Sequence, residues 1–300
     1  MNTNKTILVT GGAGFIGSEL VRYLLENTEN TVVNVDKLTY SGNLQSLVSV
    51  ASNEKYIFKQ IDICDENELK KVLLENKPDI VMHLAAESHV DRSIEGPKEF
   101  IQTNIVGTFI LLEQVKNYWQ KLNGAKKNDF RFLHVSTDEV YGDLNGKEDY
   151  FIEDSAYDPS SPYSASKASS DHLVRAWFRT YQLPVLITNC SNNYGPYQFP
   201  EKLIPHIILN AIEGKKLPID GDGKQTRCFS YIDDCLSCLI PMLDQKNLNK
   251  QTINIGPDEE FVTINKIAEI CSNLTGVNLE PIHKKDRPKE VKHALCSADK

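Results

Sequence analysis

The sequence predicts an α/β fold, a doubly wound parallel sheet with a smaller mixed α/β lobe, and three observations carry this prediction. Short apolar runs alternate with helix-like patterns over the first two thirds of the chain. These runs are almost continuously apolar, which is typical of strands covered on both faces. After Asn192 a loop rich in Gly, Pro and aromatic residues, "NNYGPYQFP", introduces shorter elements that suit a second lobe.

The elements follow from the local patterns in order. We expect strands over 6–11, 31–36, 56–62, 79–86, 130–137 and 184–189. We expect helices over 15–27, 66–77, 97–122 and 163–181. Beyond Asn192 the pattern indicates three helices, over 203–213, from after 234 to about 243, and over 263–276. It also indicates strands over 216–220 and 252–256. We therefore expect one domain from 1–190 and about 230–255, and a lobe from 191–229 and 256–300 over the carboxyl edge of the sheet.

Composition narrows the classes of partner. The net charge is −8 and no run of Lys or Arg occurs, which argues against nucleic-acid or anionic-membrane binding. No stretch approaches the ~18 apolar residues of a membrane span. The seven cysteines are odd in number and scattered, which favours free thiols in a reducing cytoplasm. Cys235 and Cys238 form a CxxC without a second ligand pair, so we expect no metal.

The turn after the first strand, "VTGGAGFIG", is a Rossmann dinucleotide fingerprint. Gly11 permits the tight turn, Gly14 lets backbone approach a pyrophosphate, and Gly17 lets the helix pack on the strand. Asp36 ends the second expected strand about 20 residues further on, where a ribose acceptor belongs. Its carboxylate would repel a 2′-phosphate, so we expect NAD rather than NADP. A Gly-rich turn that binds FAD, or nothing, is the alternative.

A second motif indicates proton chemistry. "SPYSASKAS" places Tyr163 and Lys167 at i and i+4 on one helix face. A nearby ammonium favours the phenolate, so we expect a lowered tyrosine pKa. Such a tyrosine can take a proton from an alcohol while hydride leaves the carbon. The alternative is an ordinary pair on a helix surface.

The motifs together resemble a known superfamily. The glycine turn, "HLAAESHVDRS", "STDEVYGD", "YSASKASSDHLVRAW" and "NCSNNYGPYQFPEKLIP" are similar to the extended short-chain dehydrogenase/reductases. Within these they resemble the nucleotide-sugar 4,6-dehydratases, most closely those that act on dTDP-glucose. The similarity is dense from Thr6 to about Pro205 and thins afterwards.

The resemblance implies an NAD-dependent hydro-lyase that converts dTDP-glucose to the 4-keto-6-deoxy sugar. Oxidation at C4 acidifies the C5 proton, and elimination of water across C5 and C6 then needs an acid and a base. The resemblance implies Asp138 as the acid, Glu139 as the base and Tyr163 as the base for the 4-OH. Thr137 would share the 4-OH proton, and Lys167 completes the catalytic set.

The resemblance also implies the binding residues. For the cofactor these are Gly11, Gly14, Phe15, Ile16, Gly17, Asp36, Lys37, Leu38, Asp62, Ile63, Leu84, Ala85, Ala86, Thr103, Tyr163, Lys167 and Asn193. For the substrate they are Glu87, Ser88, Thr137, Asn192, Lys202, Leu203, Arg227, Asn254 and Arg287. A homodimer through helices, and a product that feeds deoxysugar and polysaccharide synthesis such as the dTDP-rhamnose pathway, are implied as well.

The small lobe departs from the family pattern. Cys228 and Phe229 follow Arg227 where the family has Asp-Trp, and the family continues beyond the point reached at Lys300, so we expect a shortened lobe. Two alternatives therefore stay open. One is another NAD-dependent nucleotide-sugar enzyme, an epimerase or a decarboxylase, and the other is a catalytically impaired NAD-binding scaffold.

Overall fold

The computed structural model describes residues 4–144, 150–257, 261–277, 281–285, 291–293 and 295–299. Its centre is a seven-stranded sheet in the order β11-β6-β5-β4-β1-β2-β3, with every neighbouring pair parallel. The strands are β1 Thr6–Thr10, β2 Thr31–Asp36, β3 Tyr56–Gln60, β4 Ile80–His83, β5 Arg131–Thr137, β6 Val185–Cys190 and β11 Thr252–Ile255. The order reverses between β1 and β4, so the doubly wound prediction is confirmed and the switch point lies there.

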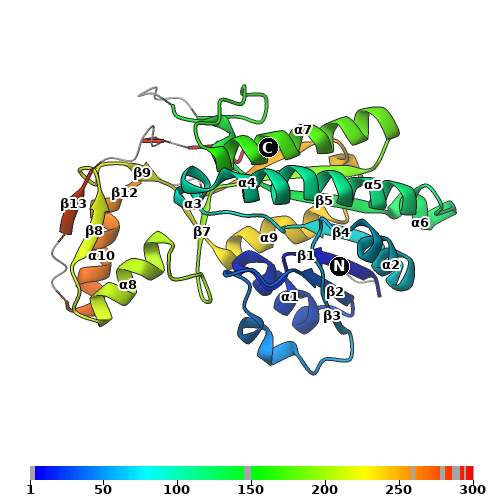
Figure 1. Ribbon diagram of the computed structural model, residues 1–300, viewed down its shortest axis with the longest axis horizontal. Coiled ribbons are helices and arrows are strands. Elements are labelled where there is room, and N and C mark those ends of the chain that lie inside the picture. The colour runs from blue at the N-terminus through cyan, green and yellow to red at the C-terminus, as the bar shows by residue number, and fades with distance from the viewer. Residues whose placement is uncertain are drawn as a thin grey trace.

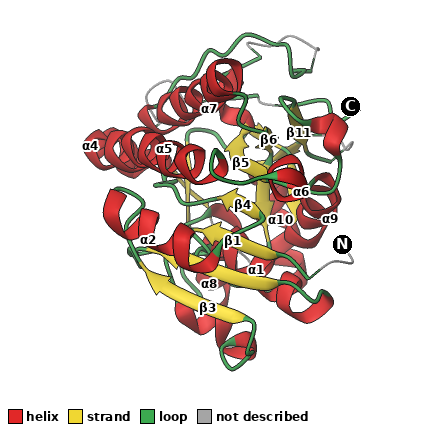
Figure 2. Cartoon of the chain, turned by 90° about the vertical axis from the view of Figure 1, so that its right-hand side faces the viewer, coloured by secondary structure: helices red, strands yellow, loops and turns green. Residues whose placement is uncertain are grey.

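Helices cover both faces of this sheet, as Figure 2 shows. One face packs on α1 Phe15–Asn27 and α9 Ile232–Met242. The other packs on α2 Glu66–Asn76, α5 Thr108–Trp119 and α7 Pro162–Tyr181. Each fully buried Leu, Ile or Val in the two cores contributes roughly 1.5–3 kcal/mol. Packing in these two cores fixes the carboxyl ends of the strands relative to one another.

A smaller lobe lies at one end of the molecule, on the left in Figure 1. Its elements are α8 Leu203–Ile212, β8 Leu217–Asp220, β9 Thr226–Arg227, β12 Val262–Thr263, α10 Ile264–Thr275 and β13 Pro281–Lys284. It has its own apolar core around Ile207 and Ile219. Between lobe and sheet, β7 Asn192–Tyr194 pairs with β10 Phe229–Tyr231. The chain leaves the sheet after β6 and returns through α9 to β11.

The helix expected over 97–122 is wrong in detail. The structure has α3 Val90–Glu95, α4 Pro97–Phe100, a π-helical segment η2 Ile101–Gly107, and then α5. Pro97 takes the first position of α4, where its missing N–H costs no hydrogen bond. A Cβ on Gly107 would lie 2.8 Å from the side chain of Ile63, so this turn packs closely on the β3–α2 connection. Such π-helical turns often mark functional sites.

Several short elements have no counterpart in the expected pattern. They are η1 Leu44–Val50, α6 Gly124–Asp129, η3 Asp138–Tyr141 and η4 Lys246–Leu248. Among the described residues, no helix is long and apolar enough to cross a bilayer.

Candidate active site

A cavity of about 1190 Å³ opens at the carboxyl edge of the sheet and extends into the small lobe. It begins at the glycine turn after β1, passes the ends of β2, β4, β5 and β6, and reaches β8 and β9. Ligands of doubly wound folds bind in this crevice. Most of the residues expected at the site line this cavity. They are Gly11, Gly14, Phe15, Ile16, Gly17, Asp36, Lys37, Asp62, Ile63, Leu84, Ala85, Ala86, Glu87, Ser88, Thr103, Thr137, Glu139, Tyr163, Lys167, Asn192, Asn193, Lys202, Leu203 and Arg227.

The glycine turn leaves no room for side chains. Gly11 has φ +75°, and a Cβ there would lie 2.7 Å from Ala85. A Cβ on Gly17 would lie 2.1 Å from the Gly11 carbonyl oxygen. Gly14 caps α1 without a side chain, so the N–H groups of the first helical turn face the cavity unblocked. This is an anion-binding helix N-terminus.

Asp36 stands at the end of β2 with its acceptor oxygens oriented by backbone. Its carboxylate accepts hydrogen bonds from Ala13 N at 2.9 Å and Leu38 N at 2.8 Å. Burial raises the pKa of this carboxyl. Lys37 Nζ is paired with Asp62 at 2.7 Å, so its charge is already partnered beside the cavity. The glycine cradle and the oriented carboxylate fit NAD and disfavour a 2′-phosphate. Leu38 takes part through its backbone N–H, and its side chain does not line the cavity.

The stretch Thr137-Asp138-Glu139 lies where β5 ends and η3 begins. The Thr137 hydroxyl accepts a hydrogen bond from Glu139 N and donates one to Asp138 Oδ1, both at 3.3 Å. The Thr137 side chain also interacts with Tyr163, where it opposes the rise of the tyrosine pKa. Thr137 therefore connects the tyrosine on α7 to the carboxyl of Asp138.

The two neighbouring carboxyl groups sit in different surroundings. Asp138 is buried, and burial, followed by the charge of Glu139, raises the pKa of its carboxyl to about 7. The charge of Arg227 and the Thr137 hydrogen bond oppose this rise. Glu139 lines the cavity, and the buried Asp138 directly precedes it at the start of η3. A carboxyl that is partly protonated at neutral pH can act as an acid beside one that acts as a base.

Tyr163 and Lys167 reach the cavity from the first two turns of α7. The helix begins with a capping box in which Ser161 and Ser164 bond each other's backbone. Lys167 Nζ donates to the Val135 carbonyl at 2.9 Å, and burial lowers the pKa of this lysine to about 8. The expected lowering of the Tyr163 pKa is wrong for the protein alone. Burial and the charge of Glu139 raise that pKa, and the interaction with Thr137 only partly opposes them.

One expected substrate residue, Asn254, does not come to the cavity. Asn254 is buried in β11, where it accepts from the Tyr141 hydroxyl at 2.9 Å and donates to the carbonyls of Phe151 and Ser297. The reason is that β11 pairs on the far side of β6 from the catalytic strand β5. Arg287 lies outside the described residues.

Other cavity residues were not expected from the sequence. These are mainly polar or aromatic groups from the small lobe and the segment before it, including Gln198, Phe199, Glu201, His206, Gln225 and Phe229. The motif "NNYGPYQFPEKLIP" could have indicated the first three. Glu201 Oε2 accepts from Arg92 Nε at 3.1 Å, a contact between segments too distant along the chain for a local pattern to predict.

Comparison with known proteins agrees with this geometry. A family model described as GDP-mannose 4,6 dehydratase matches residues 8–300. A dTDP-glucose 4,6-dehydratase of Neisseria meningitidis serogroup B is 59% identical over 270 residues, covering 90% of this chain and 76% of the relative. The dTDP-glucose 4,6-dehydratase 1 of Escherichia coli K12 is 58% identical over 276 residues, covering 89% and 76%.

Solved structures share the whole architecture. A dTDP-glucose 4,6-dehydratase from Streptomyces venezuelae, solved with NAD bound, is 38% identical and has a TM-score of 0.90, covering 98% of this chain and 88% of that one. A UDP-glucuronic acid 4-epimerase from Bacillus cereus, in complex with UDP-glucuronic acid and NAD, is 33% identical with a TM-score of 0.88, covering 98% and 90%. Dehydratases and epimerases therefore share this fold, and residues must discriminate between them.

Proposed function

Because the chain belongs to the GDP-mannose 4,6 dehydratase family, we propose that it dehydrates dTDP-glucose to dTDP-4-dehydro-6-deoxyglucose with NAD as cofactor. The observation that carries the proposal is the pair of carboxyl groups, Asp138 and Glu139, at the end of β5 beside Tyr163. Epimerisation and decarboxylation have no use for such an acid–base pair, whereas elimination of water needs both. The high identity to dTDP-glucose 4,6-dehydratases supports the same substrate.

The cofactor would be held by the glycine turn and by Asp36. When bound, NAD supplies a hydride acceptor for the oxidation at C4, a hydride donor for the reduction at C6, and a positive charge near Tyr163. The protein's own groups then handle the protons. Since the pKa of Tyr163 is raised in the protein alone, its role as a base depends on positive charge near its hydroxyl.

Three side chains divide the proton transfers. Tyr163 Oη takes the proton of the 4-OH as C4 becomes a ketone. Glu139 takes the C5 proton, which the ketone has acidified. Asp138 gives its proton to the departing 6-OH, which leaves as water. Glu139 returns its proton to C5 when C6 is reduced.

The proton balance requires a connection between Tyr163 and Asp138. Since Glu139 takes and returns the same count, the proton gained by Tyr163 equals the one that Asp138 loses. The Thr137 hydroxyl donates a hydrogen bond to Asp138 Oδ1, and its side chain interacts with Tyr163. We therefore assign Thr137 as the relay that recharges Asp138 in each turnover.

The remaining assignments concern the molecule around the site. We propose that residues 1–190 and about 230–255 bind NAD and that the lobe of 191–229 and 256–300 binds the nucleotide. A homodimer is supported by the exposed aromatic side chains Phe109 on α5 and Tyr181 on α7, with the half-buried Trp177 packed edge to face on Phe109 at 5.9 Å. The free cysteines of the described chain suit a reducing cytoplasm. The product would feed deoxysugar synthesis, such as that of dTDP-rhamnose.

The test is the mass of the product. We would incubate the purified protein with dTDP-glucose, and with UDP-glucose in parallel, and follow product mass and absorbance of NADH. A product lighter by one water, with no net NADH and a preference for the dTDP sugar, is expected. An unchanged mass with inverted stereochemistry at C4 would contradict the role of the carboxyl pair, and absence of any reaction by NAD-loaded protein would contradict the proposed function.

A further inference from the structure

A buried carboxylate lies one helical turn beyond the catalytic lysine. Asp171 follows Lys167 at i+4 on α7, just as Lys167 follows Tyr163, so the three share one face of the helix. Asp171 is fully buried and does not line the cavity. A buried carboxylate is costly unless it is paired and hydrogen-bonded. The reaction steps assigned above give it no role.

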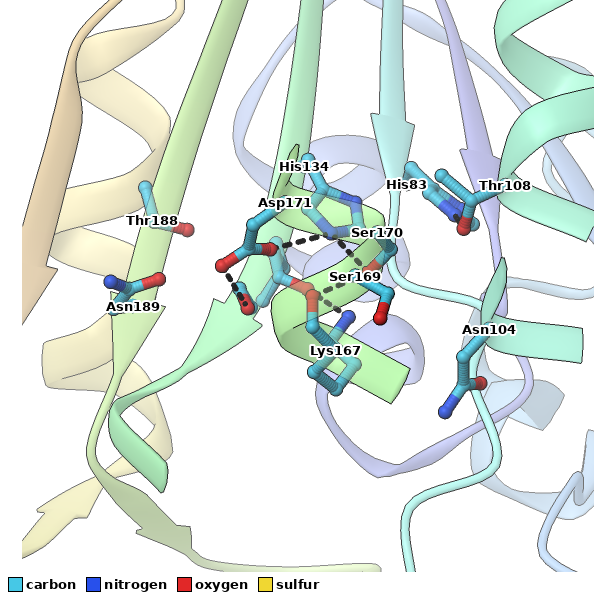
Figure 3. Close-up of polar contacts among 12 residues, drawn as sticks. His83, Asn104, Thr108, His134, Lys167, Ser169, Ser170, Asp171, Thr188 and Asn189 are labelled. Atoms are coloured by element: carbon cyan, nitrogen blue, oxygen red, sulfur yellow. Dashed lines mark hydrogen bonds and ion pairs between the residues drawn. The ribbon is translucent and has the colours of Figure 1, made fainter. Parts of the chain in front are cut away.

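The partners of Asp171 come from β5 and from the segment before α7. Its Oδ2 accepts from the Ser136 hydroxyl at 3.0 Å and from the Tyr157 hydroxyl at 2.9 Å. The Nε2 of His134 lies 3.2 Å from Oδ1. Figure 3 shows His134, Asp171 and Lys167 gathered around this part of α7. Ser136 directly precedes Thr137, so the carboxylate ties the reacting end of β5 to α7.

Two buried basic side chains act on Asp171, His134 from β5 and Lys167 from the preceding turn of α7, and each lowers the pKa of its carboxyl. Burial lowers the pKa of His134 to about 4, so the imidazole is neutral at physiological pH. With the imidazole neutral, Lys167 is the buried cation one helical turn from Asp171, and its charge and the hydrogen bonds with His134 and Ser136 lower the pKa of Asp171 against the effect of burial. The carboxylate in turn raises the pKa of Lys167 against the effect of burial. Other titratable or charged groups around the pair are Tyr163 and Arg175 from α7, Cys190 from β6 and His83 from β4.

We propose that Asp171 is a positioning residue that keeps Lys167 protonated in the closed site and fixes the β5 end that carries Thr137. The proposal rests on the proposed function, in which Lys167 acts beside Tyr163. Its distinguishing consequence is electrostatic. Loss of the carboxylate charge should make Lys167 lose its proton at lower pH, whereas loss of a hydrogen bond alone should not.

The experiment compares two conservative substitutions in the same cluster, each of which changes one polar group. Asp171→Asn removes the charge and keeps the shape, and Tyr157→Phe removes one donor to the carboxylate and keeps its charge. We would measure kcat and KM for the sugar nucleotide against pH, together with Tm and bound NAD. We expect two alkaline falls in kcat, one from Asp138 near pH 7 and one from Lys167 near pH 8. For Asp171→Asn the fall set by Lys167 should move down by about one pH unit and kcat at pH 8 should fall about fivefold, with KM changed less than threefold.

The control decides between an electrostatic and a purely structural role. Tyr157→Phe should lower Tm by an amount comparable with Asp171→Asn and leave the alkaline fall where it is in the unchanged protein. An alkaline fall that Asp171→Asn leaves in place, or that Tyr157→Phe moves equally, would overturn the proposal. If Asp171→Asn does not fold, the same alkaline fall of kcat would be measured with Asp171→Ser, which also removes the charge and leaves room for a water. The unchanged protein tests the proposed function separately. If it does not dehydrate the sugar nucleotide, the proposed function fails, whereas the proposal for Asp171 is tested by the pH dependence of the variants.

Discussion

At the scale of single residues, Thr137 decides whether the acid and the tyrosine act as one unit. Its hydroxyl donates to Asp138 Oδ1 and its side chain interacts with Tyr163, and Asp138 is buried. Because solvent reaches Asp138 poorly, a proton that enters at Tyr163 is the readiest source for recharging it. The Thr137 hydroxyl is therefore needed for Asp138 to regain its proton between one turnover and the next.

This gives a prediction for Thr137→Val. We expect its steady-state kcat to fall at least tenfold while the first turnover, measured by rapid quench, slows much less, because the equilibrated enzyme starts with Asp138 partly protonated. Thr137→Ser keeps a hydroxyl and should restore most of kcat. If the first turnover of Thr137→Val slows as much as kcat does, Thr137 acts only on the substrate and no relay operates.

The predictability of the site differs from residue to residue. The glycine turn and Asp36 were predictable because strand, turn and helix follow one another locally, and the structure brings them together at the cavity. Asn254 was misplaced because its position depends on which side of β6 receives β11, a choice that local sequence does not carry. The raised pKa of Tyr163 and the Asp171–His134 contact depend on burial and on distant segments, so no spacing could indicate them.

At the scale of elements, a cluster of contacts joins three segments at the rim of the cavity. Arg92 on α3 pairs with Glu201, N-O 3.0 Å, in the segment before α8, and its guanidinium lies 3.7 Å from the centre of the Tyr40 ring after β2. Tyr40 also packs edge to face on Phe199 at 5.5 Å. The contacts join the NAD-side loops to the segment leading into the small lobe. An exposed ion pair is worth up to about 1 kcal/mol, and stacking on an aromatic ring adds about as much.

The corresponding prediction concerns retention of NAD. Arg92→Glu should speed NAD release, followed by its loss in gel filtration, by roughly three- to tenfold, since about 1 kcal/mol corresponds to a factor of about five. Adding Glu201→Arg should recover part of the slow release by restoring an opposite-charge pair. Lys98→Glu on α4 changes a nearby exposed charge and serves as the control. Equal acceleration by Lys98→Glu would mean that net charge, and not the pair, sets the rate.

The elements themselves were predictable where periodicity is long and uniform, as for α1 and α7. The failure over 97–122 has a structural cause. The π-helical segment η2 places Asn104 inside the protein, where its side chain bonds Glu87 N and O at 2.9 Å and the Ser166 hydroxyl at 2.8 Å. These bonds tie the cavity wall to α7, and they depend on tertiary contacts that compete with regular helix. The apolar periodicity of the sequence predicts a helix with one buried face, but it does not predict the π-helical segment η2.

At the scale of the whole molecule, the acid needed for elimination costs stability. The pKa of Asp138 is about 7 in the folded protein against 3.8 for an ordinary aspartate. The folded state therefore holds a proton that the unfolded chain has lost between these pH values. Stability contributed by the neutral carboxyl is lost as pH rises from 3.8 through about 7, and the full penalty is present above that.

Asp138→Asn should accordingly give a more stable and inactive protein at alkaline pH. From a shift of about three pKa units we expect a gain in unfolding free energy on the order of 2–4 kcal/mol at pH 8, growing from near zero at about pH 4. Urea denaturation of both proteins between pH 5 and 8 would measure it. His134 has the opposite effect. Because burial lowers the pKa of its imidazole to about 4, the folded protein loses stability as pH falls below 6.5. His134 is present in both proteins, so its contribution cancels in the difference. A gain that does not grow with pH would mean that amide packing, and not the buried charge, separates the two proteins.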